Sequence, residues 1–362
     1  MIPFYDPLRT YEDNYAHGPF GVFREPSPYF CAGSPRGSFL GHPVNRPFGI
    51  PAGPLLNSAF CEAAFRHGYD VNVYKTVRTR FREAHPFPNT LAVHLDGPLT
   101  VARSGLPVVA DDDFRHVTSI TNSFGVPSRD PDEWQPDMAR AVKAAGPGQL
   151  LLGSFQGTLE EGSEGDSEAA FVADHVRAAT LVAETGARVL EMNLSCPNEG
   201  ASALLCFDTP MVTKVVDAVK NAVGDLPLIL KLAYFREDPP LARLVAATRE
   251  IVQGYAAVNT MSASVLGPDG RQALPGQGRD VCGVCGAAIS WAGLEMVGRL
   301  ATLRDRGRND YAIVGVGGVR TQEDYAAMRH AGADVVMSAT GAMFDPLLGV
   351  RIQGAAEGAR SA

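Results

Sequence analysis

Eight short apolar runs alternate with amphipathic stretches along most of this chain, and this alternation limits the fold more than any other feature. The runs have the length and composition of buried strands, and they lie at residues 48–52, 71–76, 150–155, 189–194, 226–232, 256–261, 312–316 and 334–338. Strands that alternate with helices form parallel βα units, because a crossover helix returns the chain to the start of the next strand. Eight such units predict a closed (β/α)8 barrel, the TIM-barrel fold of the α/β class.

The helical half of the pattern includes amphipathic stretches at residues 58–67, 168–185, 210–223, 240–253, 291–306 and 322–331. A doubly wound open sheet would show the same alternation. That fold is disfavoured because no Gly-x-Gly-x-x-Gly motif follows the first strand. We therefore expect a barrel domain over residues 46–362, preceded by an N-terminal arm or cap over residues 1–45.

Two segments lie outside the alternating pattern. Residues 1–45 are rich in proline, glycine and aromatic residues, with little periodicity, and are too apolar for a free tail, so we expect a folded N-terminal extension. Residues 78–149 are too many for a bare loop, so we expect them to contain small strands, including the turn-rich segment 121–128. These strands would form a small inserted β segment at the mouth of the barrel.

The charge of the chain limits its partners. The formal net charge of the 362 residues is −8, so no basic face is available to neutralise phosphates, and we expect neither nucleic acid nor a membrane as a partner. The first residues lack a basic or apolar leader, and no apolar run reaches about 18 residues, which predicts a cytoplasmic protein. Its six scattered cysteines should be reduced.

Polar and small residues gather where the predicted strands end. The fourth strand runs into the stretch that we take as the centre of the active site, with Asn193, Ser195, Cys196 and Asn198. The other strand ends carry Lys75-Thr76, Lys231, Asn259-Thr260, Gly317-Gly318 and Thr340-Gly341. All strands of a barrel point their carboxyl ends to one mouth, so these residues should meet there. Each has an ordinary interpretation when taken alone, since a cysteine often only packs and a lysine is often a solvated charge.

The last two strands give the clearest binding signal. Gly317 and Gly318 precede a helix, and glycine lets a backbone approach an anion, so we expect a phosphorylated ligand and no metal. A planar cofactor with a phosphate tail, two lysines and a cysteine suits flavin redox chemistry. Asparagines donate and accept hydrogen bonds, as a substrate with amide groups requires. Together these features predict dehydrogenation of a cyclic amide.

Six motifs of the sequence invite comparison with known enzymes. They are Tyr74-Lys-Thr-Val-Arg-Thr-Arg80, Arg82-Glu-Ala-His-Pro-Phe-Pro-Asn89, Asn122-Ser-Phe-Gly-Val-Pro127, Glu191-Met-Asn-Leu-Ser-Cys-Pro-Asn198, Val258-Asn-Thr260 and Val316-Gly-Gly-Val319. In these motifs the chain resembles the dihydroorotate dehydrogenase family, from about residue 40 to 350. The Ser-Cys-Pro-Asn form is similar to the soluble class 1 enzymes, whereas the membrane-associated class 2 enzymes have serine at the position of Cys196.

The resemblance implies an activity and its residues. Cys196 would be the base that takes a proton from C5 of dihydroorotate while C6 gives a hydride to FMN, and Lys75 would lie beside both. The implied substrate-binding residues are Asn122, Gly125, Asn193, Asn198 and Asn259. The implied FMN-binding residues are Ala52, Gly53, Lys75, Thr76, Lys231, Thr260, Gly286, Gly317 and Gly318, and Thr340 and Gly341 fall at the phosphate end.

The same resemblance places the chain in pyrimidine biosynthesis, interconverting dihydroorotate and orotate, and suggests a homodimer. The reaction needs a second electron acceptor, for which fumarate, a quinone, a nicotinamide reached through a partner subunit, and oxygen are all compatible with the barrel.

The chain departs from the family at three places. Thr340-Gly341 stands where the family usually has Gly-Thr, and Cys282 and Cys285 stand in a loop that is richer in glycine in the family. A metal centre at this pair lacks a second pair of ligands. The third departure is the arm, which could cover the mouth, form an oligomer interface or indicate another substrate. Two alternatives therefore stay open: an FMN-dependent enzyme of another cyclic amide, and a catalytically idle flavin-binding barrel.

Overall fold

The computed structural model describes residues 2–26, 35, 37–158, 167–195, 204–307 and 309–352. Eight parallel strands form its central sheet: β3 (Phe48–Gly49), β4 (Val71–Val77), β8 (Leu150–Phe155), β9 (Leu190–Asn193), β10 (Leu228–Leu232), β11 (Gly254–Ala257), β14 (Ala312–Val316) and β15 (Val335–Met337). Their spatial order is β3-β15-β14-β11-β10-β9-β8-β4. The amide of Asp70 donates to the carbonyl of Phe48 at 2.8 Å, which links the two ends of the sheet. The predicted (β/α)8 barrel is confirmed, and every predicted strand overlaps an observed one.

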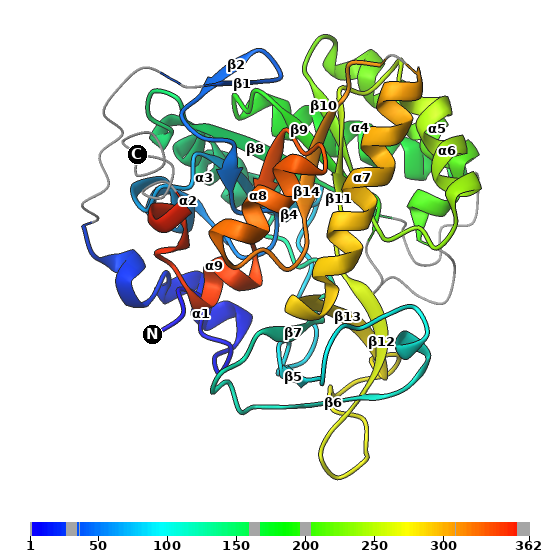
Figure 1. The fold of residues 1–362 in the computed structure, drawn as a ribbon. Coiled ribbons are helices and arrows are strands. Elements are labelled where there is room, and N and C mark those ends of the chain that lie inside the picture. Colours follow the sequence, from blue (N-terminus) through cyan, green and yellow to red (C-terminus); the bar gives the residue numbers. More distant parts are fainter. Residues whose placement is uncertain are drawn as a thin grey trace, which may run out of the picture.

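Helices surround this sheet (Figure 1). They are α2 (Ser58–Arg66), α3 (Pro131–Ala144), α4 (Ser167–Glu184), α5 (Thr209–Val223), α6 (Asp238–Thr248), α7 (Ser290–Gly307), α8 (Gln322–His330) and α9 (Thr340–Phe344). Short 3-10 turns lie at Gly21–Arg24, Arg103–Gly105, Leu205–Phe207 and Ala287–Ile289. The six predicted helices are present. Helix α3 was not among them, because Pro136 lies inside it and weakens its helical signal.

Helix α5 illustrates why the chain forms these elements. The side chain of Asp208 caps its first turn by accepting from the amide of Met211, and Gly224 ends it with a φ of 62°. Its buried residues are four valines at positions 212, 215, 216 and 219, which is the spacing of one helical face. The valine face packs inward against the barrel, so local caps and tertiary packing agree.

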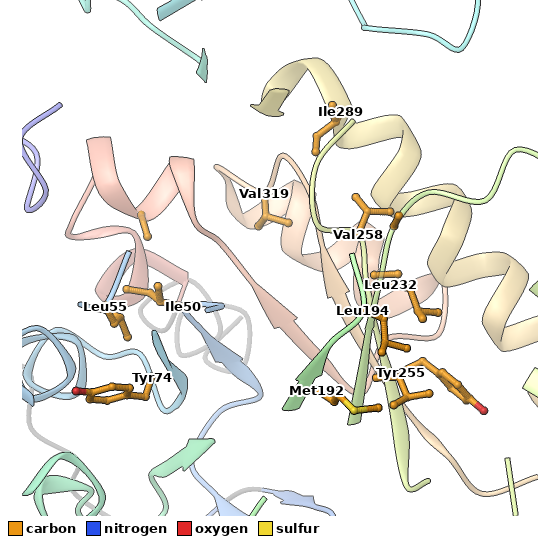
Figure 2. Packing of buried hydrophobic residues seen from close by; sticks show 14 of the residues in the cluster. Ile50, Leu55, Tyr74, Met192, Leu194, Leu232, Tyr255, Val258, Ile289 and Val319 are labelled. Atoms are coloured by element: carbon orange, nitrogen blue, oxygen red, sulfur yellow. The ribbon is translucent and has the colours of Figure 1, made fainter. Parts of the chain in front are cut away.

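The strands bury side chains on both faces. Leu190, Met192 and Leu194 belong to the apolar cluster between the sheet and its helices, where Figure 2 shows Met192 and Leu194 near Leu232. The intervening residues of β9 face the barrel interior instead, because successive side chains of a strand alternate. The interior has its own apolar cluster, to which Phe39 and Val44 contribute.

Phe39 and Val44 come from a hairpin of β1 (Gly37–Phe39) and β2 (His42–Val44), at one end of the barrel in Figure 1. A five-stranded sheet lies at the opposite end and consists of β5 (Ala92–His94), β6 (Val108–Asp111), β7 (Ser119–Asn122), β12 (Met261–Leu266) and β13 (Val281–Gly286). The predicted insertion is therefore present in β5, β6 and β7. The hairpin closes one end with apolar side chains, and the polar mouth is left at the other.

The other two strands of the small sheet correct two predictions. The predicted strand at residues 256–261 is divided, because β11 ends at Ala257 and Met261 begins β12. The predicted loop at residues 279–286 contains strand β13. Its Val-Cys-Gly-Val-Cys-Gly sequence has two glycines, which have low strand propensity, so only pairing with β12 and β7 reveals the strand.

The N-terminal arm packs on the barrel through aromatic residues. Phe4 contacts Phe60 of α2 edge-on at 6.3 Å between ring centroids, and its amide donates to the carbonyl of Met343 in α9. The arm contains helix α1 (Tyr11–His17), which its weak periodicity did not predict. Within the described residues, no helix is both long and apolar enough to cross a membrane. The boundary of the arm near residue 45 stays a prediction.

Candidate functional site

A cavity with an empty volume of about 720 Å³, open solvent at its mouth included, lies where the barrel strands end and the small sheet begins. Eight predicted site residues line it: Ala52, Gly53, Lys75, Asn122, Lys231, Asn259, Thr260 and Thr340. Asn122 comes from the end of β7 in the small sheet, and the others come from the ends of barrel strands or the segments after them. The fold thus brings these residues to one cavity, as the positions of the strand ends indicated.

Strand β4 carries Lys75 and Thr76, which a regular strand would send to opposite faces. The pairing of β4 with β8 shifts between Tyr74 and Val77, so β4 contains a bulge at these two residues. Lys75 lines the cavity and donates to the carbonyl of Pro127 at 3.3 Å. Thr76 is within hydrogen-bond distance of Ser154, 2.9 Å between hydroxyl oxygens. Because of the bulge, both consecutive side chains face the barrel interior, although Thr76 does not line the cavity.

The asparagines form a hydrogen-bonded network at the mouth. The Asn259 amide donates to the Ser195 carbonyl at 2.9 Å and approaches the Asn193 side-chain oxygen at 3.5 Å. Asn193 is buried and donates to Gln156 at 2.8 Å, so it lies behind Asn259 and does not line the cavity. Cys196 and Asn198 lie outside the described residues. Their neighbour Ser195 ends the described part of this segment at the network.

A buried carboxyl group lies close to the cavity. Glu191 is 1% exposed and faces the barrel interior, and one of its oxygens accepts from Ser154 at 3.3 Å. Its other oxygen has no hydrogen-bond partner among the described residues. Burial raises the pKa of Glu191, and the positive charge of Lys231 opposes this rise. Burial likewise lowers the pKa of Lys231, and Glu191 opposes that change, so the two buried groups support each other's charge.

We expect Glu191→Gln to change how stability depends on pH. Since the pKa of folded Glu191 lies above its ordinary value of 4.5, the folded protein holds this proton more tightly than the unfolded chain does. Stability from this group is therefore lost as the pH rises from 4.5 through the folded pKa. Glutamine removes this dependence, so the unfolding free energy of the variant, relative to wild type, should increase across that interval in denaturant titrations. The exposed Glu250→Gln is the control, and equal curves for both variants would contradict the expectation.

Backbone donors are available after strand β14. The amide groups of Gly317 and Gly318 form no hydrogen bond with the described part of the chain. The amides just before α8 are less available, because the Asp324 carboxylate accepts from those of Arg320 and Thr321 in a capping box. An anion would thus be held by the glycine pair and not by the amides of this cap. Neither glycine is among the residues that line the cavity itself.

Three other predicted glycines lie outside the cavity lining, and each is in close contact with a neighbour. A Cβ on Gly286 would lie 2.3 Å from the carbonyl oxygen of Thr118, and one on Gly341 would lie 2.3 Å from that of Val319. A Cβ on Gly125 would meet the ring of His85 at 2.4 Å. Packing therefore explains why these positions are glycine, and their predicted ligand contacts remain predictions.

Arg279 connects the loops around Asn122 through hydrogen bonds. It is 4% exposed, and its guanidinium donates to the carbonyls of Pro86, Pro88, Pro275 and Ser123, at 2.6 to 3.0 Å, and to the Ser123 hydroxyl at 3.0 Å. Ser123 lies between the cavity residues Asn122 and Phe124. Arg279 is therefore a positioning residue for this wall of the cavity, which nothing in the sequence indicated beyond its place before the Cys-x-x-Cys.

Arg279→Ala should lower the free energy of unfolding by about 3 kcal/mol or more, because several buried carbonyls lose a charged donor. Thermal and denaturant unfolding measure this loss. Arg271→Ala is the matched control, since Arg271 lies in the same segment and its side chain is 88% exposed. A loss of unfolding free energy as small as that of the control would show that water replaces the guanidinium without a loss of stability.

Several cavity residues were missed by sequence reasoning. They are Tyr5, Tyr11, Pro51, Pro54, Leu56, Thr90, Ile120, Thr121, Phe124, Cys285, Val316, Ala339 and Met343. Cys285 accepts a hydrogen bond from Thr340 at 3.4 Å, and burial raises the pKa of its thiol to about 11. Cys282 and Cys285 are three residues apart on a strand, so their side chains point to opposite faces. For Tyr5 and Tyr11 the available sequence signal was an apolar arm that could cover the mouth, and for Cys285 it was the departure from the family pattern.

Known proteins resemble the chain along most of its length. A family model described as dihydroorotate dehydrogenase matches residues 114–353. A protein named dihydroorotate dehydrogenase, from Dictyostelium discoideum, is 31% identical over 368 aligned residues that cover 96% of each chain. Two proteins named dihydroorotate dehydrogenase B (NAD(+)), catalytic subunit, are similar over less of their length. The one from Methanopyrus kandleri is 31% identical over 74% of this chain and 72% of its own. The one from Solidesulfovibrio magneticus is 30% identical over 48% and 55%.

Proposed function

The chain belongs to the dihydroorotate dehydrogenase family and is an oxidoreductase that acts on CH–CH donors, and on this premise we propose that it interconverts dihydroorotate and orotate with FMN as the hydride acceptor. The observation that carries the proposal is the convergence on one cavity of Lys75, Asn122 and Lys231 from three separate strands, and of Asn259 from the segment after β11. Each side chain alone has an ordinary interpretation, but their convergence supplies positive charge and amide groups at one place.

The residues present fit a flavin mononucleotide. The amides of Gly317 and Gly318, which have no hydrogen-bond partner among the described residues, are suited to a phosphate. The cavity that Lys231 lines is also lined by small or polar residues such as Gly53, Thr260 and Thr340. When bound, the flavin supplies the hydride acceptor. Lys231 would stabilise the negative charge that the reduced ring carries, and Glu191 would support the charge of Lys231.

The remaining residues would hold the substrate and move its proton. Asn259 and Asn122 line the cavity, and both offer a donor and an acceptor for the amide groups of a pyrimidine ring. Asn193 would orient Asn259 through the observed network. Cys196 follows Ser195 directly, and as thiolate it would take the C5 proton, since an unperturbed thiol pKa of about 8.5 is close enough to neutral pH for a base.

The test is anaerobic mixing of the purified yellow protein with dihydroorotate, followed by fumarate. Loss of the flavin absorbance on the first addition supports the proposal, and its return on the second identifies an acceptor. No loss of absorbance, together with no perturbation by millimolar orotate, would reject the pyrimidine substrate in favour of another cyclic amide or an idle flavin-binding barrel. The homodimer and the cytoplasmic location are further proposals, which sedimentation and cell fractionation test.

A further inference from the structure

The N-terminal arm contributes two tyrosines to the cavity. Tyr5 and Tyr11 line it together with Lys75 and Asn259, although neither belongs to the barrel or to the small sheet. Each is only 4% exposed. Tyr5 contacts the ring of Phe124 edge-on at 5.9 Å between centroids, and Tyr11 contacts the same ring at 6.2 Å. The three rings form one wall of the cavity.

Hydrogen bonds and ring contacts fix this wall in place. Asn14 is fully buried, and its side chain accepts from the amide of Asp6 and donates to the carbonyls of Asp6 and Thr10, so the loop before α1 has one shape. Asn57, the N-cap residue of α2, donates to the carbonyl of Tyr15 at 2.9 Å. Arg129 pairs with Glu12 across the boundary between arm and barrel. The tyrosines are therefore held at set positions relative to the barrel mouth.

Both hydroxyl groups lack a protein partner. Neither forms a hydrogen bond with another residue in the part of the chain that the structure describes. Neither hydroxyl oxygen is among the fully buried side-chain atoms that lack a partner, so each keeps some access to solvent. Burial raises the pKa of each phenol, so both hydroxyls keep their protons at neutral pH and can donate. Two fixed donors at one cavity wall can therefore donate to an acceptor that binds within the cavity.

We propose that Tyr5 and Tyr11 are ligand-binding residues, which donate hydrogen bonds to a carbonyl or carboxylate oxygen of a small molecule in this cavity. The inference rests on the proposed function, because it assigns these oxygens to one of the two reactants. The acceptor oxygen belongs to the oxidised ring with its carboxylate, or to the molecule that reoxidises the flavin. In either case the arm determines which molecules fit, and the barrel supplies the charges.

The chemistry of the wall supports this class of ligand. Phe124, Leu56, Ile120 and Met343 make the surroundings apolar, so a phenolic donor in this wall has no competing water when a ligand fills the cavity. The cations of the site are Lys75 and Lys231, which come from barrel strands and not from the arm. An uncharged donor suits the oxygen of a neutral ring or of a group whose charge is balanced elsewhere.

The experiment uses Tyr5→Phe, Tyr11→Phe and the double variant, with Tyr15→Phe as the matched control. Tyr15 lies in α1, its ring is covered by Arg129 at 4.5 Å, and it does not line the cavity. Thermal unfolding first establishes that all four variants fold. Titration with orotate, followed by the flavin spectrum and by calorimetry, measures ligand affinity. Dithionite-reduced protein is then mixed with fumarate, with a water-soluble quinone, and with oxygen as the reference that offers no carbonyl group.

Each single variant should lower either the affinity for orotate or the rate of reoxidation by fumarate or quinone. The expected change is about 3- to 10-fold relative to Tyr15→Phe, which is the effect of one lost hydrogen bond. Weaker orotate binding assigns the hydroxyls to the pyrimidine ring. Slower reoxidation by fumarate or quinone, with oxygen unchanged, assigns them to the acceptor. Variants that equal the control in both orotate affinity and reoxidation rate would overturn the proposal. It would also be overturned if the wild-type protein neither binds orotate nor reacts faster with the carbonyl acceptors than with oxygen. A failure of dihydroorotate to reduce the flavin rejects only the proposed function, because the reoxidation arm does not need that substrate.

Discussion

Replacing Cys196 by alanine should slow the reduction of the flavin by dihydroorotate by about 10²- to 10⁴-fold, the usual contribution of a positioned general base. The expectation follows from the place of Cys196 directly after Ser195, whose carbonyl and hydroxyl accept from Asn259 at the cavity. Stopped-flow absorbance under anaerobic conditions measures the rate. Orotate affinity should change much less, because the asparagines that would hold the ring remain.

The control for this loss is Cys206→Ala. Cys206 is fully buried, and burial raises its thiol pKa to about 12, so it stays protonated and serves packing. Its removal should leave the rate of flavin reduction close to that of wild type. Cys196→Ala with a normal rate would refute the assignment of the base, and would favour a barrel that binds a flavin without performing this oxidation.

The barrel and its polar mouth were predictable because they depend on local patterns. Val71 and Leu150 lie in apolar runs of strand length, and such runs predict strands whatever surrounds them. Lys231 and Asn259 could be placed at the cavity because the carboxyl ends of barrel strands share one face. Neither step required knowledge of distant contacts.

The remaining parts of the site depend on contacts between residues far apart in the sequence. Strand β13 has low intrinsic propensity and exists through its pairing with β7, about 160 residues earlier. Arg279 bonds to Pro86 and Pro88 at a similar separation. Tyr5 and Tyr11 lie in a segment without clear periodicity, and only the packed arm brings them to the cavity. No local pattern encodes these contacts.

Two of the departures from the family pattern, at Thr340 and Cys285, are in contact in the structure. Thr340 donates its hydroxyl hydrogen to the sulfur of Cys285. The side chains at these two departures from the family pattern therefore contact each other. The glycine of the pair, Gly341, sits where a Cβ would collide with the carbonyl of Val319. The order Thr-Gly is therefore consistent with this local packing, and the free donors of Gly317 and Gly318 remain available.

Lys231→Ala should lower the rate of flavin reduction by about 10²- to 10³-fold, the range found when one group that stabilises developing charge is removed. Lys231 is 5% exposed at the cavity, and the nearby carboxyl of Glu191 opposes the loss of its proton. Without this ammonium group, the negative charge of the reduced ring would lose a buried cation that lines the cavity. The midpoint potential of the bound flavin should therefore shift to a more negative value, which spectroelectrochemical titration measures.

The matched control is Lys220→Ala, since Lys220 lies on α5 and donates to the carbonyl of Leu226, at the start of the same βα unit and away from the cavity. Its removal should leave the potential unchanged. An unchanged potential in Lys231→Ala would show that another group compensates the charge, and Lys75 would be the candidate because it lines the same cavity. If the midpoint potential shifts in Lys231→Ala and Glu191→Gln partly reproduces the shift, the buried carboxyl acts through the lysine. Glu191 is not among the cavity-lining residues, so it would influence the flavin only by supporting the charge of Lys231.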